Sequence, residues 1–286
     1  MSQGAPEYHD VIVVGGGVAG LGVATLLGGW RPRLQGPVPK PLDHPSLKSI
    51  IEDARDDLLS MDMRALAEVP VSPFDVFRLL HHPQQEYRGL EAYPLRFEEG
   101  APFDWLMLTD EPVGGLWNNV PRNQLTLSPA HWMELSAYPV ARYFEEQGIA
   151  HDPNELIRKD LLVSYYHYVP SRLGIEDNIE VGWIVENVAP GGEGEGRFRL
   201  SARRRDTGEK ADFTCEYLVY AAGPRVKMRR LGVPGEYTQH YVSHHYDHFD
   251  DYPGDRVMVV GGGRSADWAA TELHDAGRDV TYVMRP

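Results

Sequence analysis

The chain has 286 residues, of which 42% are hydrophobic and 24% charged, as is usual for a globular protein. Its 42 acidic and 28 basic residues give a formal net charge of −14, which argues against nucleic acid or an anionic membrane as the main partner. The one cysteine, Cys215, excludes an internal disulfide framework. We therefore expect a cytoplasmic protein built as one large domain or two linked domains.

The first predicted unit is a strand, a glycine turn and a helix near the N-terminus. An apolar run at residues 11–14, after Asp10, breaks into the turn Gly15–Gly20, which reads G-G-G-V-A-G, and a small-residue helix pattern follows. In a G-x-G-x-x-G turn, the first glycine permits the bend, the second lets the backbone approach a pyrophosphate, and the third packs helix on strand. Acidic flanks and many glycines favour this interpretation over a signal peptide or membrane span, with an interfacial membrane segment as the alternative.

The second strand of this unit is displaced along the chain. Residues 30–42 contain too many prolines for a buried strand. We expect the strand instead at Phe103–Thr109, followed by Asp110 and Glu111. Residues from about 31 to 101 are then an insertion, helical in part, around Ser46–Leu66 and Ser72–Leu80.

The middle of the chain predicts a helix and then a β-meander. Asp152 is an N-cap candidate, Pro153 follows it and Glu155 stands three residues on, so a helix is expected to start here and run through Ile157–Tyr168. Three alternating segments, separated by a glycine-rich turn and a polar turn, predict a three-stranded meander. These segments are Ile179–Val188, Arg197–Arg203 and Ala211–Tyr220.

A second glycine turn, Gly261–Ala266, stands near the C-terminus. The apolar strand before it breaks into G-G-G-R-S-A, and a helix Ser265–Ala276 and a strand Asp279–Met284 follow. Two such turns suggest two nucleotides in one chain, and hence electron transfer between them. The fold class is therefore α/β: a Rossmann-like nucleotide-binding domain with a β-meander, and the start of a second Rossmann-like nucleotide-binding domain.

Other chemistries lack their usual patterns. Four histidines fall close together in the connector before the second glycine turn, but no regular H-x-x-x-H helix or carboxylate geometry is expected there, so no metal site is expected. They are His240, His244, His245 and His248. No G-x-S-x-G is present, so a serine-hydrolase triad is not expected either.

Taken in order, these motifs resemble those of the class B flavoprotein monooxygenases. The matching parts are the first G-x-G-x-x-G, the Gly-Gly-Leu-Trp turn at 114–117, the strand ending Ala-Ala-Gly223, and the second glycine turn. Within that group the chain is most similar to the oxidative-stress-induced growth inhibitor family. That closer similarity is carried by residues 26–32, the insertion after them, residues 125–135 and the Tyr165–Tyr168 segment.

The resemblance implies an FAD-binding domain at 1–235 and an incomplete NAD(P)H-binding domain at 236–286. Gly15, Gly17 and Gly20 would hold the FAD pyrophosphate, with a glycine turn lacking a ligand as the alternative. Asp110, with Glu111 beside it, would hold the FAD ribose, although a solvated turn acid would look the same.

Further positions follow from the same resemblance. Gly114 and Gly115 would let backbone close on the flavin ring, and Trp117 would pack alongside or simply belong to the core. Asn119, in the segment Asn-Val-Pro-Arg, would be the catalytic residue, since an amide can both donate and accept, although a turn asparagine is the alternative. Val185 would meet the adenine through its backbone, and Gly223 would lie near the cofactor.

At the second turn, Gly261, Gly263 and Ser265 would hold the NADPH pyrophosphate. Arg285 closes the next strand where NAD sites carry an acid, and with Arg264 nearby it would favour the 2′-phosphate of NADPH, a surface arginine being the alternative.

The implied activity is an FAD- and NADPH-dependent monooxygenase, which inserts one oxygen from O2 into a small-molecule substrate through a flavin C4a-(hydro)peroxide. An NAD(P)H:acceptor flavin reductase and a non-catalytic regulatory protein that keeps the fold are the alternatives. Family members continue beyond the second glycine turn. The chain is therefore expected to be C-terminally truncated, inactive, or completed by a partner chain.

Overall fold

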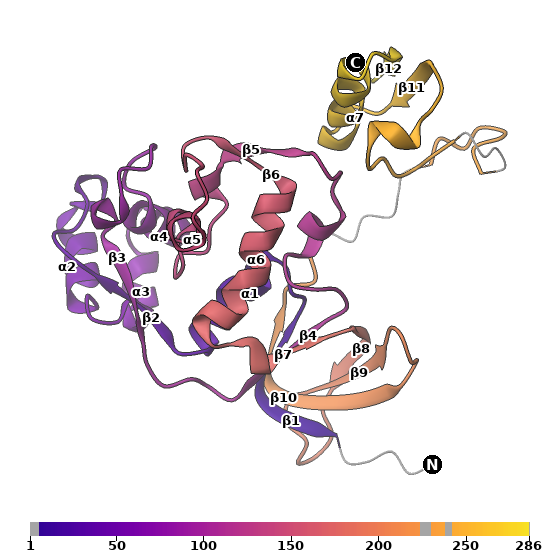
Figure 1. Cartoon of the computed structure of the whole chain (residues 1–286). Helices are drawn as coiled ribbons and strands as arrows, with labels where there is room; N and C mark the ends of the chain where they lie inside the picture. The colour runs from indigo at the N-terminus through magenta and orange to yellow at the C-terminus, as the bar shows by residue number, and fades with distance from the viewer. Residues whose placement is uncertain (1–5, 224–229, 238–241, 286) are drawn as a thin grey trace.

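A computed structural model describes residues 6–223, 230–237 and 242–285 (Figure 1). Its largest sheet has six strands in the order β7-β4-β1-β10-β9-β8. β1 (Glu7–Val14) runs parallel to β4 (Trp105–Thr109) on one side and to β10 (Lys210–Tyr220) on the other. The expected strand at 103–109 is thus confirmed as the neighbour of β1.

The predicted meander is also present, with one refinement. β8 (Trp183–Pro190), β9 (Phe198–Arg204) and β10 pair antiparallel in succession. Gly182, at φ +94°, separates β8 from the short β7 (Ile179–Val181), which pairs parallel with β4. The Gly182 N–H donates to the Thr109 carbonyl, and the Gly182 carbonyl accepts from Arg205, so the sheet curls and brings the start of β8 to the end of β4.

Both faces of this sheet are buried. On one face β1 contributes Val11 and Val13 to a core shared with α1 (Val18–Leu27), α5 (Val140–Gln147) and α6 (Lys159–Leu173). On the other face Ile12 and Val14 pack inside the curl of the meander. A continuous β-branched run is what a strand covered on both sides requires.

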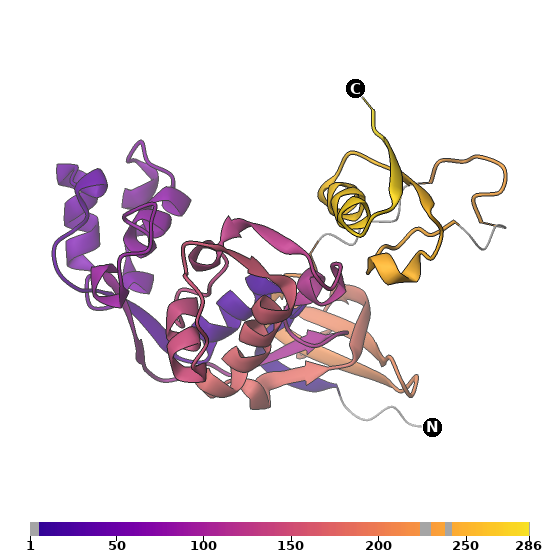
Figure 2. The same ribbon diagram turned by 45° about the horizontal axis from the view of Figure 1, so that its top comes forward.

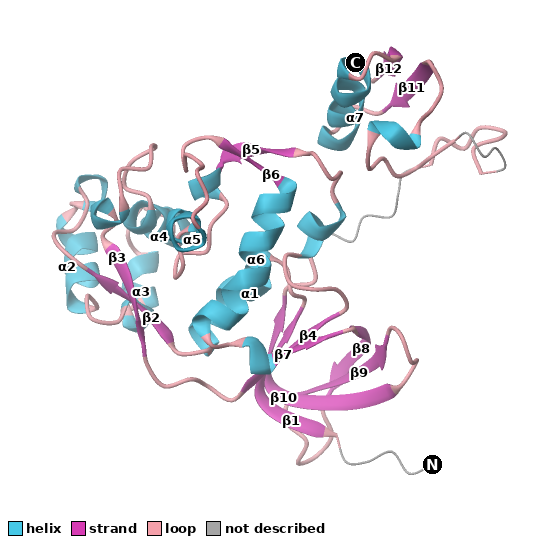
Figure 3. Ribbon diagram, viewed as in Figure 1, coloured by secondary structure: helices cyan, strands magenta, loops and turns pink. Residues whose placement is uncertain are grey.

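The insertion forms a separate small core (Figure 3). It contains α2 (Pro45–Asp53), α3 (Met63–Ala67) and α4 (Pro73–His81), with the short 3-10 turns η1 (Lys40–Leu42), η2 (Leu58–Ser60) and η3 (Leu90–Ala92). Its helices occur where they were expected. Residues 30–34 do form a strand, β2 (Trp30–Leu34), which pairs only with β3 (Leu95–Glu99). A two-stranded ribbon tolerates Pro32 because one edge needs no N–H donor.

The helix start predicted at Asp152 is wrong. The Asp152 carboxylate accepts from the Asn154 N–H and closes a turn, and β6 (Leu156–Arg158) then pairs with β5 (Leu125–Pro129). Ile157 is fully buried and donates its N–H to Thr126 Oγ1, so strand pairing overrides the local helix signal. The helix, α6, begins at Lys159 instead.

The C-terminal unit stands apart from the large sheet (Figures 1 and 2). It consists of the 3-10 turn η7 (Phe249–Asp251), β11 (Arg256–Val260), α7 (Arg264–Asp275) and β12 (Asp279–Val283), with β11 parallel to β12. The remaining turns of the chain are η4 (Gly115–Asn119), η5 (Ala130–Trp132) and η6 (Glu176–Asn178). This arrangement is the strand–helix–strand that the second glycine turn predicted.

Candidate functional site

The first glycine turn joins β1 to α1 under tight steric constraints. Gly15 adopts φ +108°, and a Cβ atom on it would lie 2.4 Å from the carbonyl oxygen of Ala221. A Cβ on Gly20 would lie 2.0 Å from the Gly15 carbonyl oxygen. Both positions therefore need glycine, because the turn is pressed between the end of β10 and the first turn of α1.

Gly17, in contrast to Gly15 and Gly20, has open space where a side chain would stand. It is the N-cap residue of α1, provides no side-chain cap, and a Cβ on it would meet no atom within 4 Å. The N-terminus of α1 therefore faces open space with uncapped backbone N–H groups. The helix dipole and these donors together favour an anion such as a pyrophosphate.

A second loop lies against this turn, after β4. Gly114 donates its N–H to the Gly16 carbonyl at 2.8 Å, and Gly16 donates its own to Thr109 Oγ1 at 3.1 Å. Gly115, at φ +55°, comes so close that a Cβ on it would lie 2.8 Å from the Gly17 Cα. The Gly-Gly pair thus places backbone directly beside the open face of α1.

Thr109 is a site residue that the sequence reasoning missed. Its hydroxyl accepts from Gly16 and donates to the Glu111 carbonyl at 2.9 Å, so one buried side chain connects the glycine turn to the loop after β4. The available signal was a hydroxyl residue at the last position of the strand, one place before the expected acid.

Asp110 lies at the end of β4, as expected for a ribose-binding acid. Its side chain is 13% exposed, and its Oδ2 accepts from Arg205 Nη2 at 2.8 Å. Glu111 lies 3.5 Å from the same Arg205 nitrogen and accepts from Asn119 Nδ2 at 2.6 Å. Arg205 comes from the turn between β9 and β10, and no local motif identifies it.

The other predicted residues of the first site lie on η4, after β10 and on β8. Trp117 is partly buried and packs against the core beneath α1, whereas Asn119 is exposed on η4. Gly223, at φ +67°, follows β10 just after the Ala221 contact with the turn. Val185 is partly buried on β8, opposite Ala202 of β9, three residues beyond the Gly182 contact with β4.

The second glycine turn repeats the geometry of the first. Gly261 has φ +149°, and a Cβ on it would lie 3.1 Å from the Ala266 Cβ. Gly263 is the N-cap of α7 and gives no side-chain cap, and a Cβ on it would meet no atom within 4 Å. Ser265 is exposed in the first turn of α7, and Arg285 is exposed just after β12. This site therefore also presents an uncapped helix N-terminus to solvent.

The Arg264 side chain is engaged in contacts with other protein groups. Its guanidinium donates to Asp267 at 2.7 Å and to the Leu125 carbonyl at 3.2 Å, so it holds α7 against β5. Beside this contact, Arg122 forms a bidentate pair with Asp247, with the shorter distance 2.7 Å. These bonds join the two units through residues 122–125.

The C-terminal histidines are engaged in ordinary contacts where the structure describes them. His244 Nε2 lies 3.2 Å from Glu236 and its ring stacks on Tyr237, while His248 Nδ1 lies 3.2 Å from Asp250. The carbonyl of His245 accepts from Ser243 and Tyr252. His240 lies outside the described residues.

Cys215 is fully buried on β10, and burial raises the pKa of its thiol. A buried thiol with a raised pKa is a poor nucleophile. Within the parts of the chain that the structure covers, none of the helices is both long and apolar enough to span a bilayer.

The similar proteins include a growth inhibitor, a disulfide reductase and a flavin monooxygenase. Oxidative stress-induced growth inhibitor 2 of Homo sapiens is 25% identical over 191 residues, which are 63% of this chain and 36% of that protein. The bacillithiol disulfide reductase Bdr (YpdA) of Bacillus cereus shares the fold at TM-score 0.58 and 20% identity, over 97% of this chain and 59% of that one. A flavin monooxygenase of Stenotrophomonas maltophilia shares the fold at TM-score 0.53 and 16% identity, over 98% of this chain and 58% of that one.

The chain thus spans little more than a third of the length of its curated relative. A family model described as pyridine nucleotide-disulphide oxidoreductase matches residues 100–286, which is more than half of the chain. The matched part contains β4, the meander and the whole second glycine turn, and the solved structures confirm the Rossmann-like flavoprotein fold. The chain belongs to the pyridine nucleotide-disulphide oxidoreductase family.

Proposed function

We propose that this chain binds FAD at the β1–α1 turn and NADPH at the β11–α7 turn, and that it serves as an NADPH-dependent flavin monooxygenase. The observation that carries the proposal is the pair of uncapped helix N-termini, each preceded by a glycine at positive φ and each open in front of its second glycine. Similar structures agree with this cofactor pair, since a cadaverine monooxygenase among them is bound to FAD and a cyclohexanone monooxygenase to NADP+.

The residues at the first turn fit FAD sterically. Gly17 leaves room for a phosphate at the start of α1, and Gly115 lets the second loop lie beside it without a side chain between them. Asp110 would accept from ribose hydroxyls while Arg205 holds the carboxylate in place. When bound, a flavin supplies two-electron redox chemistry between a nicotinamide and O2.

Asn119 would position the reacting groups through its amide. Its Nδ2 donates to Glu111, which leaves the amide oxygen as the atom for a cofactor or substrate donor. The neighbouring Asn118 donates to the carbonyls of Pro112 and Val113 and fixes the loop from within. Gly261, Gly263, Ser265 and Arg285 would hold NADPH in the second unit.

The buried Cys215 supports a monooxygenase over a dithiol reductase. A disulfide-exchange mechanism needs an accessible thiolate, usually with a partner cysteine, and this chain has one cysteine, which is inaccessible. We infer that the electrons from NADPH would go to O2, of which one oxygen atom would enter a small-molecule substrate and the other would leave as water. Transfer to another acceptor is the second candidate, and it is favoured by the reductases among the similar structures.

The test is the visible spectrum of the purified protein, followed by anaerobic NADPH addition and then O2. Monooxygenase activity predicts a yellow protein, bleaching by NADPH faster than by NADH, and reoxidation by O2 with H2O2 or an oxygenated product. Bleaching by NADPH with reoxidation only by an added quinone or dye would assign the reductase instead. A colourless protein that neither binds added FAD nor oxidises NADPH would contradict both enzymatic functions.

A further inference from the structure

A buried group of two histidines and one carboxylate joins the insertion to the central domain, away from both glycine turns. His81 is the last residue of α4, His82 follows it, and Glu134 lies just after η5. His81 Nε2 lies 3.2 Å from Glu134 Oε1, and His82 Nε2 lies 3.6 Å from the same oxygen. Side chains from two distant parts of the sequence therefore converge on one point.

Two of the three converging atoms lack hydrogen-bond partners. His81 Nε2 and Glu134 Oε1 are both buried and neither is aligned for a hydrogen bond, despite their short separation. The Glu134 side chain is 0% exposed, and only its Oε2 is satisfied, by the Val140 N–H at 2.8 Å. A buried polar atom without a partner costs free energy, so a further group between these atoms would stabilise the arrangement.

The separations suit a tetrahedral metal ion. At metal–ligand bond lengths of about 2.0–2.2 Å, two ligand atoms of a tetrahedral zinc site stand about 3.3–3.6 Å apart. The observed 3.2 and 3.6 Å fall close to this range, and the three ligand atoms all lie within 4.8 Å of one another. Two imidazoles and one carboxylate are also a ligand set that zinc accepts, with a fourth position for water.

Both histidines are buried, each only 7% exposed. Aromatic rings enclose His82, with centroids 5.3 Å away for Tyr93, 5.5 Å for His131 and 5.1 Å for Trp132. The Tyr93 hydroxyl is buried and also unpartnered.

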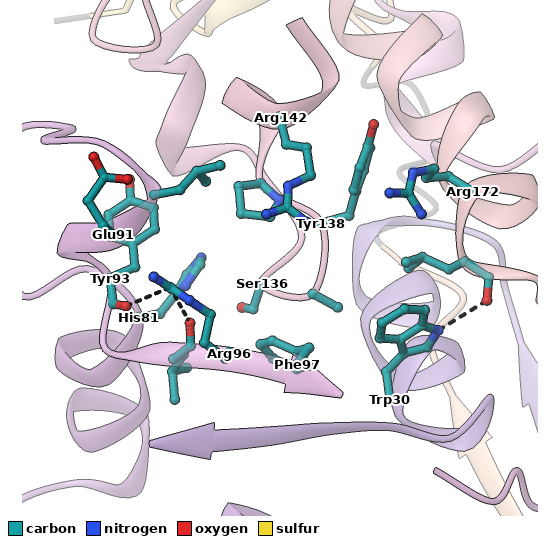
Figure 4. A pocket seen from close by; sticks show the side chains of 15 residues that line it. Trp30, His81, Glu91, Tyr93, Arg96, Phe97, Ser136, Tyr138, Arg142 and Arg172 are labelled. Atoms are coloured by element: carbon teal, nitrogen blue, oxygen red, sulfur yellow. Dashed lines mark hydrogen bonds between the residues drawn. The ribbon is translucent and has the colours of Figure 1, made fainter. Parts of the chain in front are cut away.

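A cavity lies beside this group, with His81 in its wall. It has a volume of about 350 Å³ and lies between the insertion and the central domain, with Arg96 and Tyr138 also in its wall (Figure 4). Trp30 and Leu173, near the C-terminal ends of α1 and α6, close its other side, so the cavity lies at the far end of α1 from the FAD turn.

We propose that His81, His82 and Glu134 bind one Zn2+ ion, which fastens α4 of the insertion to the segment before α5. The ion enters from the cavity on the side of His81. Its main role is structural, because the ligands come from two separately packed cores, and among the described residues this is the one group of three His, Cys, Asp or Glu side chains close enough together to hold a metal ion.

The test is the metal content of the full chain, purified with a tag that holds no metal and without chelator. Elemental analysis should find one zinc per chain in the wild type. It should find none in Glu134→Gln, which keeps the side-chain shape, or in His81→Ala. His44→Ala is the matched control, because His44 is an exposed histidine of the same insertion without a side-chain bond, and this variant should keep its zinc.

Two further measurements keep the result decisive if a variant does not fold. Removing the metal from the wild type should lower Tm, and Zn2+ at 100 times its Kd should raise it again by roughly 5–10 °C. Co2+ added to the metal-free protein should produce the intense visible absorption of a tetrahedral site. Wild-type protein that carries no metal, does not respond to Zn2+ in Tm and gives no such Co2+ spectrum would overturn the proposal and leave a buried His–Glu contact only.

Discussion

Gly15 and Ala221 lie so close together that any side chain at position 15 would collide with the Ala221 carbonyl oxygen, 2.4 Å from the Cβ position. A Cβ atom on Gly17, two residues later, would have no atom within 4 Å. The two glycines of one motif thus have different reasons to be glycine. Gly15 is required by the fold, whereas the open space at Gly17 is what the proposed FAD site needs.

This difference gives a paired prediction. Gly15→Ala should destabilise the chain by about 2 kcal/mol or more, because the backbone is at φ +108° and cannot move away from β10. Gly17→Ala, at φ −72°, should fold with an unchanged Tm but bind FAD at least about tenfold more weakly, a cost of about 1.4 kcal/mol. Urea unfolding and FAD titration measure the two effects. Unaltered FAD affinity in Gly17→Ala would place the pyrophosphate elsewhere.

Thr109→Val tests the connection between the two loops. The substitution keeps the shape of the side chain but removes the acceptor for the Gly16 N–H and the donor to the Glu111 carbonyl. With Thr109 only 4% exposed, we expect a loss of about 1–3 kcal/mol in the free energy of unfolding, together with weaker FAD binding. Thr207→Val, in the exposed turn between β9 and β10, is the control and should change neither quantity by much.

The sequence predicted the elements of the site better than their connections. The glycine turns, the displaced strand β4 and the meander all produce local patterns of period and punctuation, so each was found. Arg205 and Thr109 act through contacts with residues far away in the chain. No local pattern marks Arg205, and the only local signal for Thr109 is its place as a hydroxyl residue at the end of β4. The same reason explains the error at Asp152, where pairing with β5 decides the structure and the local helix signal does not.

Substitutions at Asp110 and at Arg205 should both weaken FAD binding, the first more than the second. Asp110→Asn keeps the size of the side chain but removes the charge, so binding of ribose hydroxyls should weaken by about tenfold, or about 1.4 kcal/mol. Arg205→Met should have a smaller effect, because it frees the carboxylate from one partner without removing it. FAD titration by flavin fluorescence measures both. A larger loss in Arg205→Met than in Asp110→Asn would show that the arginine itself contacts the cofactor.

Arg285 determines the nicotinamide preference in the proposed function. Arg285→Ala should raise the KM for NADPH by about tenfold or more and leave that for NADH nearly unchanged, because only NADPH carries the 2′-phosphate. Arg256→Ala is the control, since Arg256 is exposed at the opposite end of β11 from the glycine turn. Steady-state NAD(P)H oxidation, or the rate of anaerobic flavin reduction, gives the ratio. Equal losses with both nucleotides would mean that Arg285 acts through the fold.

An ion pair between Arg172 and Glu146, beside the cavity, should make a pH-dependent contribution to the free energy of unfolding. Glu146 on α5 accepts from Arg172 Nε of α6 at 3.0 Å and from the Tyr138 hydroxyl at 2.6 Å. The Arg172 guanidinium, with help from Tyr138, holds the pKa of Glu146 below its usual value. Because the folded-state pKa is the lower one, the bond stabilises the protein above the unfolded pKa of about 4.3 and is lost as the pH falls through the folded value.

Arg172→Met should therefore lower the free energy of unfolding by up to about 1 kcal/mol at pH 7, a modest amount because both side chains are roughly one-third exposed. The difference from wild type should shrink steadily below about pH 4, as protonated Glu146 loses its attraction for the guanidinium in the wild type as well. Urea unfolding across this pH range measures it. Arg88→Met, which breaks the exposed pair with Glu86, should show almost no difference at any pH. A difference for Arg172→Met that is constant with pH would mean that the arginine stabilises α6 by packing on the Tyr138 ring, 5.4 Å from its guanidinium carbon, rather than by charge.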